Sequence, residues 1–246
     1  MYLSVPSWVI PGTYLENLHF LADHPVLTGV ELLFFMYDAE VKRLLDTEWA
    51  GIQEYAGRFV YTAHLPDPLQ PAHEELVARL LPFAHHLIVH PSSPEQVEAQ
   101  GKLLNGWTEK YGGSTQGREA GHFLLENTQT SRFEALLPQL PAETGLCMDT
   151  GHLLLEGKSP ADFFKRYPGR IREIHLHGLD REQAALDGRL PDHRPVRAGD
   201  RWFRDLVPVL ENFTGVVNLE VFSWEEACMS IDTLGAMGLL GVNKAG

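Results

Sequence analysis

The segment GLCMDTGHLLLEG, residues 145–157, decides the fold. Its apolar start predicts a short strand, GLCMDT (145–150), whose near-continuous apolarity is typical of strands buried on both faces in parallel sheets. A carboxylate, Asp149, stands near the end of this strand, and we expect Gly151 to let the backbone turn so that His152 faces the same pocket. A buried carboxylate is costly unless it is paired or coordinated, so Asp149 needs partners from other parts of the chain.

The same pattern, a short apolar run followed by a longer amphipathic segment, recurs along the whole chain. Helix starts are indicated by Ser93 before Pro94, by Ser159 before Pro160, and by a capping box of Ser223 and Glu226. Eight alternating units predict a single (β/α)8 TIM-barrel domain over residues 1–246, with a doubly wound open sheet as the alternative. No GxGxxG follows the first strand, which argues against a nucleotide-binding open sheet. The expected strands are residues 2–8, 29–35, 58–65, 86–91, 122–128, 145–150, 172–178 and 216–222.

Composition narrows the class of function. The 246 residues are 44% hydrophobic and carry 20 basic against 33 acidic side chains, a net charge of −13, which disfavours nucleic-acid binding. Without an apolar run of about 18 residues or a secretory signal, we expect no membrane association. Cys147 and Cys228 form no CxxC pair, which fits barrel packing in a reducing, cytoplasmic protein. We therefore expect a small-molecule substrate.

Residues able to bind a metal stand at the ends of six successive predicted strands. In a parallel barrel these ends meet at one face, so residues far apart in sequence converge there. Several carboxylates and imidazoles in one place would repel one another without a cation, which predicts a divalent metal centre of one to three ions. Oxygen and nitrogen ligands without sulfur suit Mn²⁺, Zn²⁺, Co²⁺ or Fe²⁺. The strand-end residues are His64, His90, Glu126, Asp149, His175 and Glu220; His152, Asp192 and His193 are further candidate ligands.

Four motifs, LLEN (124–127), MDTGH (148–152), EIHLHG (173–178) and LEVF (219–222), resemble the xylose-isomerase-like, apurinic-endonuclease-type TIM-barrel superfamily. The resemblance, which includes AP endonuclease family 2, runs from about Val30 to Leu240. It implies that one ion is bound by four ligands, as in sugar isomerases and epimerases, and that further ions are bound by additional histidines, as in the zinc-dependent endonucleases. The four ligands are Glu126, Asp149, His175 and Glu220; the additional histidines are His64, His90 and His152.

The segment after the seventh predicted strand departs from the endonuclease pattern. In the endonucleases, an Asp-x-His pair in this segment completes the third ion site. In this chain the corresponding residues, Asp192 and His193, are adjacent. HLHGLD, the DH dipeptide and LEVFSWEEACMSIDTL resemble most the cobamide-remodelling phosphodiesterases, which hydrolyse the nucleotide-loop phosphoester of a cobamide. The resemblance therefore implies a metal-dependent phosphodiesterase.

In a phosphodiesterase, Glu126 would bridge two ions and hold the attacking water, Glu220 would complete one ion, and His152 would orient phosphate or bind a third ion. His177 points to the same face as His175 but lies less deep, so we interpret it as substrate-binding. Arginines after the seventh strand could contact phosphate, and Arg194 and Arg197 are the main candidates.

Three alternatives stay open. In a single-metal sugar isomerase or epimerase, acting on a ketose or inositol-like substrate, Glu126 and Glu220 would shuttle a proton at the substrate carbon. This chemistry does not need His64 and His90, which favours the hydrolase. An apurinic DNA endonuclease would need a basic surface, and a barrel that binds metal without catalysis is the non-enzymatic alternative.

Overall fold

The computed structural model describes residues 1–111, 123–180 and 191–240. The strands are β1 (Tyr2–Pro6), β2 (Gly29–Leu33), β3 (Val60–His64), β4 (His86–Val89), β5 (Phe123–Glu126), β6 (Gly145–Asp149), β7 (Ile171–His175) and β8 (Val216–Asn218). The α-helices are α1 (Tyr14–Ala22), α2 (Ala39–Glu54), α3 (Glu74–Leu80), α4 (Val97–Tyr111), α5 (Thr130–Leu136), α6 (Thr150–Leu155), α7 (Pro160–Arg166), α9 (Arg201–Leu210) and α10 (Trp224–Ala236). Short 3₁₀ turns are η1 (Tyr55–Gly57), η2 (Pro71–His73) and η3 (Leu137–Gln139).

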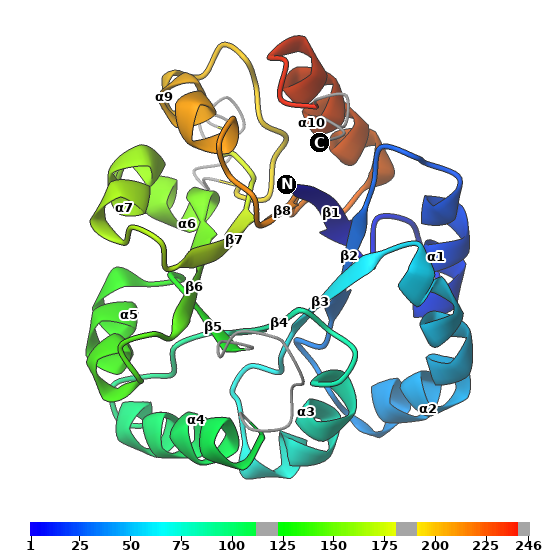
Figure 1. Cartoon of the computed structure of the whole chain (residues 1–246), viewed down its shortest axis with the longest axis vertical. Helices are drawn as coiled ribbons and strands as arrows, with labels where there is room; N and C mark the ends of the chain where they lie inside the picture. The colour runs from blue at the N-terminus through cyan, green and yellow to red at the C-terminus, as the bar shows by residue number, and fades with distance from the viewer. Residues whose placement is uncertain (112–122, 181–190, 241–246) are drawn as a thin grey trace.

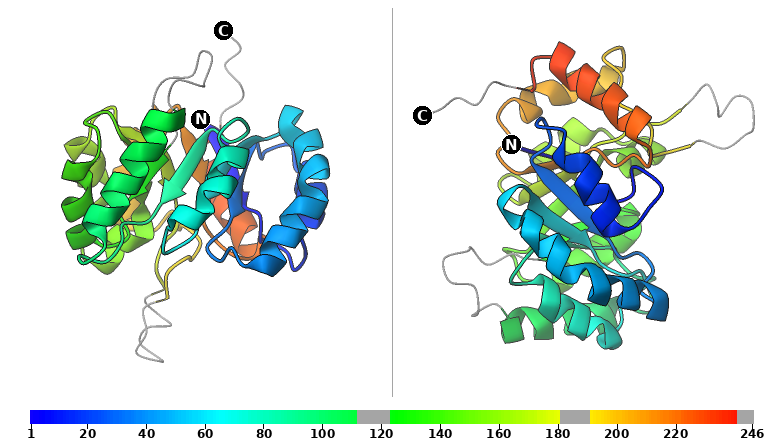
Figure 2. Two further views of the ribbon diagram at one scale, coloured as in Figure 1. Left: turned by 90° about the horizontal axis from the view of Figure 1, so that it is seen from below. Right: turned by 90° about the vertical axis from the view of Figure 1, so that its right-hand side faces the viewer.

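The eight strands form a closed parallel barrel in sequence order. Closure is made by β1 and β8, which pair in parallel with Leu3 opposite Val217. Helices surround the barrel on its outside (Figures 1 and 2). The predicted (β/α)8 barrel is therefore confirmed, and the open doubly wound sheet is excluded. None of the described helices is long and apolar enough to cross a membrane.

Side chains alternate between two environments along each strand. In β2, Val30 and Leu32 belong to the main apolar core between the barrel and the helices. Glu31, between them, is also fully buried but points to the inside of the barrel, where it meets His175 of β7. This alternation, which follows from the two-residue period of a strand, places every second residue inside the barrel.

One irregularity keeps β7 in phase with its neighbour. Leu146 pairs with Ile171, but the next residue of β6, Cys147, pairs with Glu173, so Arg172 is an extra residue in β7. Arg172 is exposed, whereas Glu173 and His175 are fully buried. The β-bulge therefore turns the acidic and imidazole side chains of β7 inward, opposite Cys147 and Asp149.

The predicted helix starts hold for two of three segments. Ser159 Oγ accepts a hydrogen bond from the Asp162 amide at the start of α7, and Ser223 Oγ accepts one from the Glu226 amide at the start of α10. The carboxylate of Glu226 bonds Ser223 Oγ and Arg194 instead of completing a capping box. Helix α4 begins at Val97 because residues 94–96 form a separate turn after Ser93.

Candidate metal centre

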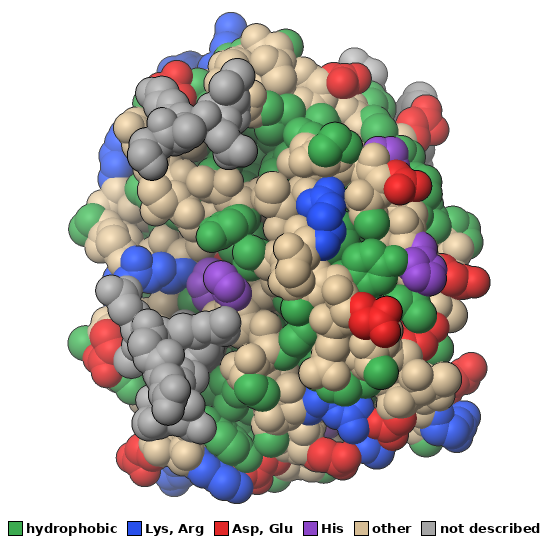
Figure 3. Space-filling model, turned by 45° about the vertical axis from the view of Figure 1, so that its right-hand side comes forward, with side chains coloured by type: hydrophobic (Ala, Val, Ile, Leu, Met, Phe, Trp, Pro, Cys, Tyr) green, Lys and Arg blue, Asp and Glu red, His purple; other side chains and the backbone are tan. Residues whose placement is uncertain are grey.

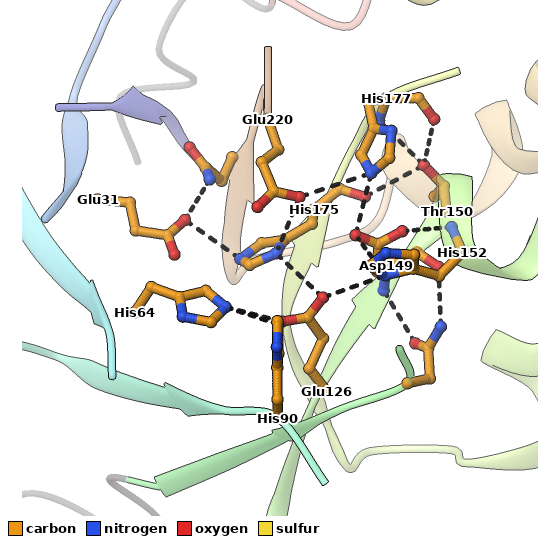
Figure 4. A network of polar contacts seen from close by, with 12 residues as sticks. Glu31, His64, His90, Glu126, Asp149, Thr150, His152, His175, His177 and Glu220 are labelled. Carbon is orange, nitrogen blue, oxygen red and sulfur yellow. Dashed lines mark hydrogen bonds and ion pairs between the residues drawn. The ribbon is translucent and has the colours of Figure 1, made fainter. Parts of the chain in front are cut away.

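Nine of the residues proposed from the sequence meet at the carboxyl-terminal end of the barrel. His64, Glu126, Asp149 and His175 end strands β3, β5, β6 and β7. The other five lie just beyond strand ends or in the segments that follow. Figure 4 shows most of them pointing toward one another. The nine are His64, His90, Glu126, Asp149, His152, His175, His177, His193 and Glu220.

A three-donor group lies on the side of β3, β4 and β5. His64 Nε2 lies 2.9 Å from His90 Nε2, and Glu126 Oε2 lies 3.2 and 3.1 Å from these two nitrogens. Donors bonded to one tetrahedral ion at about 2.1 Å stand roughly 3.4 Å apart. The three donors are therefore spaced to hold one ion.

Both imidazoles of this group are oriented by acceptors behind them. His64 Nδ1 lies 3.1 Å from the Leu65 carbonyl, and His90 Nδ1 lies 3.0 Å from Asp67 Oδ2. A carbonyl and a carboxylate can only accept, so both Nδ1 atoms carry a proton. Both Nε2 atoms, which face Glu126, are therefore the atoms that would bind an ion after losing their own protons. Asp67 was not predicted from the sequence, because it lies in a loop after Pro66 without any strand-end signal.

Asp67→Asn is expected to weaken binding of the ion at His90 by about 10- to 100-fold, because an amide orients the ring less strongly than a carboxylate. Competition with a fluorescent chelator would measure this affinity. Asp162→Asn, a change of another exposed aspartate, is the control. Unchanged affinity in Asp67→Asn would show that the His90 ring is held by other contacts.

A four-donor group of buried residues, Glu126, Asp149, His175 and Glu220, lies beside the first. His175 Nδ1 lies 3.3 Å from Glu220 Oε2 and 3.7 Å from Glu126 Oε1. Glu126 therefore belongs to both groups: its Oε2 faces His64 and His90, while its Oε1 faces the four-donor group. This geometry suits a carboxylate that bridges two ions.

A third group contains His177, His193 and Glu220. The His193 amide donates to His177 Nδ1 at 2.9 Å, so His177 Nε2 bears the proton and donates to Asp149 Oδ2 at 3.0 Å. His177 thus orients Asp149, a contact that was not predicted from the sequence. His152 Nδ1 lies 3.3 Å from Asp149 Oδ2 and 3.5 Å from Glu126 Oε1.

The electrostatics of these groups favour positive charge. Burial opposes ionisation of the Glu126 and Asp149 carboxyls, but the surrounding histidines outweigh it and hold both pKa values well below the usual range. Burial also opposes charge on His152, yet Asp149 and Glu126 raise its pKa to about 11, and Glu126 and Asp67 raise that of His90 to about 10. Without a metal, protons on histidine balance the carboxylates.

Unsatisfied atoms show that a divalent ion fits here. His152 Nδ1, both ring nitrogens of His175 and Glu220 Oε2 are buried without a hydrogen-bond partner in the described part of the chain. Such atoms are rare in folded proteins, and each has a lone pair or proton aimed among other donors. These clusters of histidine, glutamate and aspartate could bind metal ions.

The segment after β6 differs from the sequence expectation in one respect. Asp149 Oδ1 accepts from the His152 amide at 2.7 Å and caps α6, so Gly151 lies inside a helix and makes no special turn. A Cβ at Gly151 would stand 2.0 Å from His177 Cε1. Glycine is therefore needed to make room for the His177 ring.

Three candidates lie outside the donor groups. Arg194 Nη1 pairs with Glu226 Oε1 at 2.7 Å, and Arg197 is exposed on the surface. Asp192 is half-buried and belongs to none of the donor groups formed by the described residues, whereas its neighbour His193 does. Two further arginines that could contact phosphate, Arg181 and Arg189, lie outside the described residues.

Comparisons with known proteins were made by sequence and by structure. No protein-family model matches the chain. A segment of 59 residues is 41% identical to inosose dehydratase of Lacticaseibacillus casei, which covers 24% of this chain. The match spans only 19% of that relative's length, about a fifth.

Solved structures match over nearly the whole chain at low identity. The probable 3-DHS dehydratase AsbF of Bacillus anthracis, involved in petrobactin synthesis, has a TM-score of 0.64 at 14% identity, covering 99% of this chain and 100% of its own. L-ribulose 3-epimerase has a TM-score of 0.59 at 14% identity, with 100% and 89% covered. AP endonuclease family 2 of Brucella melitensis has a TM-score of 0.55 at 14% identity, with 96% and 98% covered. The chain therefore has the (β/α)8 barrel fold of the xylose-isomerase-like type.

Proposed function

We propose that this protein is a metal-dependent enzyme that hydrolyses a phosphoester at a multinuclear centre. The observation that carries the proposal is the double use of Glu126, whose two oxygens face a three-donor and a four-donor group. An enzyme that uses one ion needs only the four-donor group. The three-donor group, with His64 and His90, would then have no role in binding metal. Bound divalent ions would supply Lewis-acid polarisation of the phosphoryl oxygens and lower the pKa of water.

The residues that bind the ions would belong to two groups that share Glu126. His64, His90 and Glu126 would hold one ion, and Asp149, His175 and Glu220 would complete a second around Glu126. Their fixed positions at strand ends keep the donors in place before substrate binds.

His152 is suited to move a proton. Its side chain is 20% exposed, and its Nδ1 lies near the Asp149 and Glu126 carboxylates, so it can carry a proton to the leaving oxygen at the mouth of the site. With His193 it could alternatively contribute to a third ion, with Asp192 as a further proposed ligand.

For the substrate we propose a small phosphodiester, specifically the nucleotide-loop phosphodiester of a cobamide, as the motif resemblance implies. Arg197, exposed after β7, is the proposed phosphate contact, and Arg194, which pairs with Glu226 in the structure, is the second. On the face shown in Figure 3, lysine and arginine side chains are scattered among acidic ones and form no broad patch. The net charge of −13 of the whole chain supports a small molecule rather than a nucleic acid as the substrate. We further propose a single-domain protein that works in the cytoplasm.

A second candidate is a single-metal isomerase, epimerase or dehydratase acting on a sugar or polyol. It is favoured by the placement of Glu126 and Glu220 on either side of His175, with two carboxylates available to exchange a proton at a substrate carbon. The names of the similar proteins, inosose dehydratase and L-ribulose 3-epimerase, support it as well.

His90→Ala separates the two candidates. For the hydrolase we expect the bound metal to fall by one ion per chain and cleavage of a cobamide or of bis-p-nitrophenyl phosphate to fall on the order of 10²- to 10³-fold. Metal analysis of protein purified without chelators, followed by both assays, would measure this. His19→Ala, on the outer helix α1, is the control. A wild type with one ion, epimerase or dehydratase activity and no phosphoester cleavage would reject the hydrolase.

A further inference from the structure

The inside of the barrel has an apolar side and a polar side. On β4, β5 and β6 the inward side chains Ile88, Leu124 and Cys147 form a small apolar cluster. On the other strands the barrel instead contains hydroxyl, amide and carboxyl groups. The polar residues are Ser4, Glu31, Thr62, Glu173 and Asn218, each at most 1% exposed.

Two carboxylates lie at the centre of this polar side. Glu31 Oε2 accepts a hydrogen bond from Asn218 Nδ2 and lies 3.2 Å from His175 Nε2. Glu173 Oε2 lies 3.0 Å from His86 Nδ1. The second oxygen of each carboxylate, Oε1, has no hydrogen-bond partner within the described residues. Glu31, Glu173 and His175 each offer one ligand atom, all within 4.8 Å of one another.

Neutral oxygens supply an independent sign of a missing ligand. Ser4 Oγ, Thr62 Oγ1 and Asn218 Oδ1 are also buried without a hydrogen-bond partner in the part of the chain described. Strand register places Ser4 opposite Asn218 and Thr62 opposite Glu31. Five orphaned oxygens on neighbouring strands thus gather on one side of the barrel, where unsatisfied polar atoms are strongly unfavourable.

We propose that the barrel interior holds a second cation site, in which Glu31 and Glu173 bind a divalent ion together with neutral oxygens of Ser4, Thr62 and Asn218. The oxygen-rich donor set suits a hard ion such as Mg²⁺, Mn²⁺ or Ca²⁺, whose two charges balance the two carboxylates.

The site is distinct from the candidate metal centre above it. The His175 ring separates the two, since its Nδ1 faces Glu126 and Glu220 while its Nε2 faces Glu31. The proposed inner cation site therefore does not depend on the proposed hydrolase activity, and the failure of one proposal would not reject the other.

Crystals of the wild-type protein grown with Mn²⁺, with data collected on both sides of the manganese absorption edge, would test the site directly. We expect an anomalous peak between Glu31 and Glu173, separate from any peak at Glu126. Water density alone at this position, or a direct carboxyl–carboxylate hydrogen bond without an anomalous peak, would overturn the proposal.

Variants test the same point in solution. Glu173→Gln and Thr62→Val are expected to lower the bound Mn²⁺ by up to one ion per chain and to reduce the rise in melting temperature that Mn²⁺ produces. Ile88→Val, on the apolar side of the same interior, is the matched control and should keep the full metal content. A folded Glu173→Gln protein with wild-type Mn²⁺ content would reject the site. If that variant does not fold, the wild-type anomalous data decide.

Discussion

Glu126→Gln is expected to abolish turnover, with a loss on the order of 10⁴-fold or more, because the variant damages both metal-binding groups at once. Glutamine keeps the shape of the side chain but removes the charge that would bridge two ions, and one of its two terminal atoms becomes a donor. The atom that becomes NH₂ would point either at His64 and His90 or at His175. Both arrangements place an N–H where a lone pair is needed.

Turnover and metal content should fall together in this variant. Steady-state kinetics with elemental analysis would establish the effect, and circular dichroism would show that the barrel is intact. Glu211→Gln, the same chemical change at an exposed glutamate just after α9, is the control and should retain both turnover and metal content. Wild-type activity in Glu126→Gln would mean that the centre is assigned to the wrong residues.

Gly151→Ala is expected to displace the His177 ring, since the new Cβ would overlap it. Overpacking of a buried site costs about 1–3 kcal/mol, which for a protein of this size lowers the melting temperature by about 3–10 °C. Loss of the hydrogen bond from His177 to Asp149 should also reduce metal affinity by about 10- to 100-fold.

Gly106→Ala provides a matched comparison for this variant. Gly106 lies in α4, and no atom lies within 4 Å of the position its Cβ would take. There the helix propensity of alanine should stabilise the protein by about 0.4–1 kcal/mol. Calorimetric melting temperatures of the two variants would separate the effect of steric overlap at Gly151 from the effect of alanine's helix propensity. Equal stabilisation in both would show that His177 moves aside at little cost.

The sequence was sufficient to predict the barrel and much of the donor set. Asp149 and Glu220 could be found because carboxylates are rare inside apolar strands, and barrel topology requires strand ends to converge. The same signal was present in GVELL and REIH, where Glu31 and Glu173 interrupt apolar runs before the strand ends. These two residues were not predicted, because the criterion used was a ligand-type residue at the end of a strand, and Glu31 and Glu173 lie within their strands.

Other features depend on geometry that no local pattern specifies. His193, and not the adjacent Asp192, joins the third group, and His193 adopts a left-handed backbone conformation with φ of 50° that no local pattern predicts. Asp67 reaches His90 from an exposed loop across 23 positions of sequence. The role of Gly151 is steric and arises only when His177, from the segment after β7, is in place.

The extra residue in β7 determines how the chain tolerates changes in length. Removing Arg172 would leave Ile171 followed by Glu173, so the outward–inward alternation would continue and Glu173 would remain opposite Cys147. Removing Ile174 instead would invert the facing of His175 and His177 and send both imidazoles toward the helices. Deletions two positions apart therefore have opposite consequences for the direction of the His175 and His177 side chains. The chain can tolerate loss of a residue at Arg172 but not between Glu173 and His177.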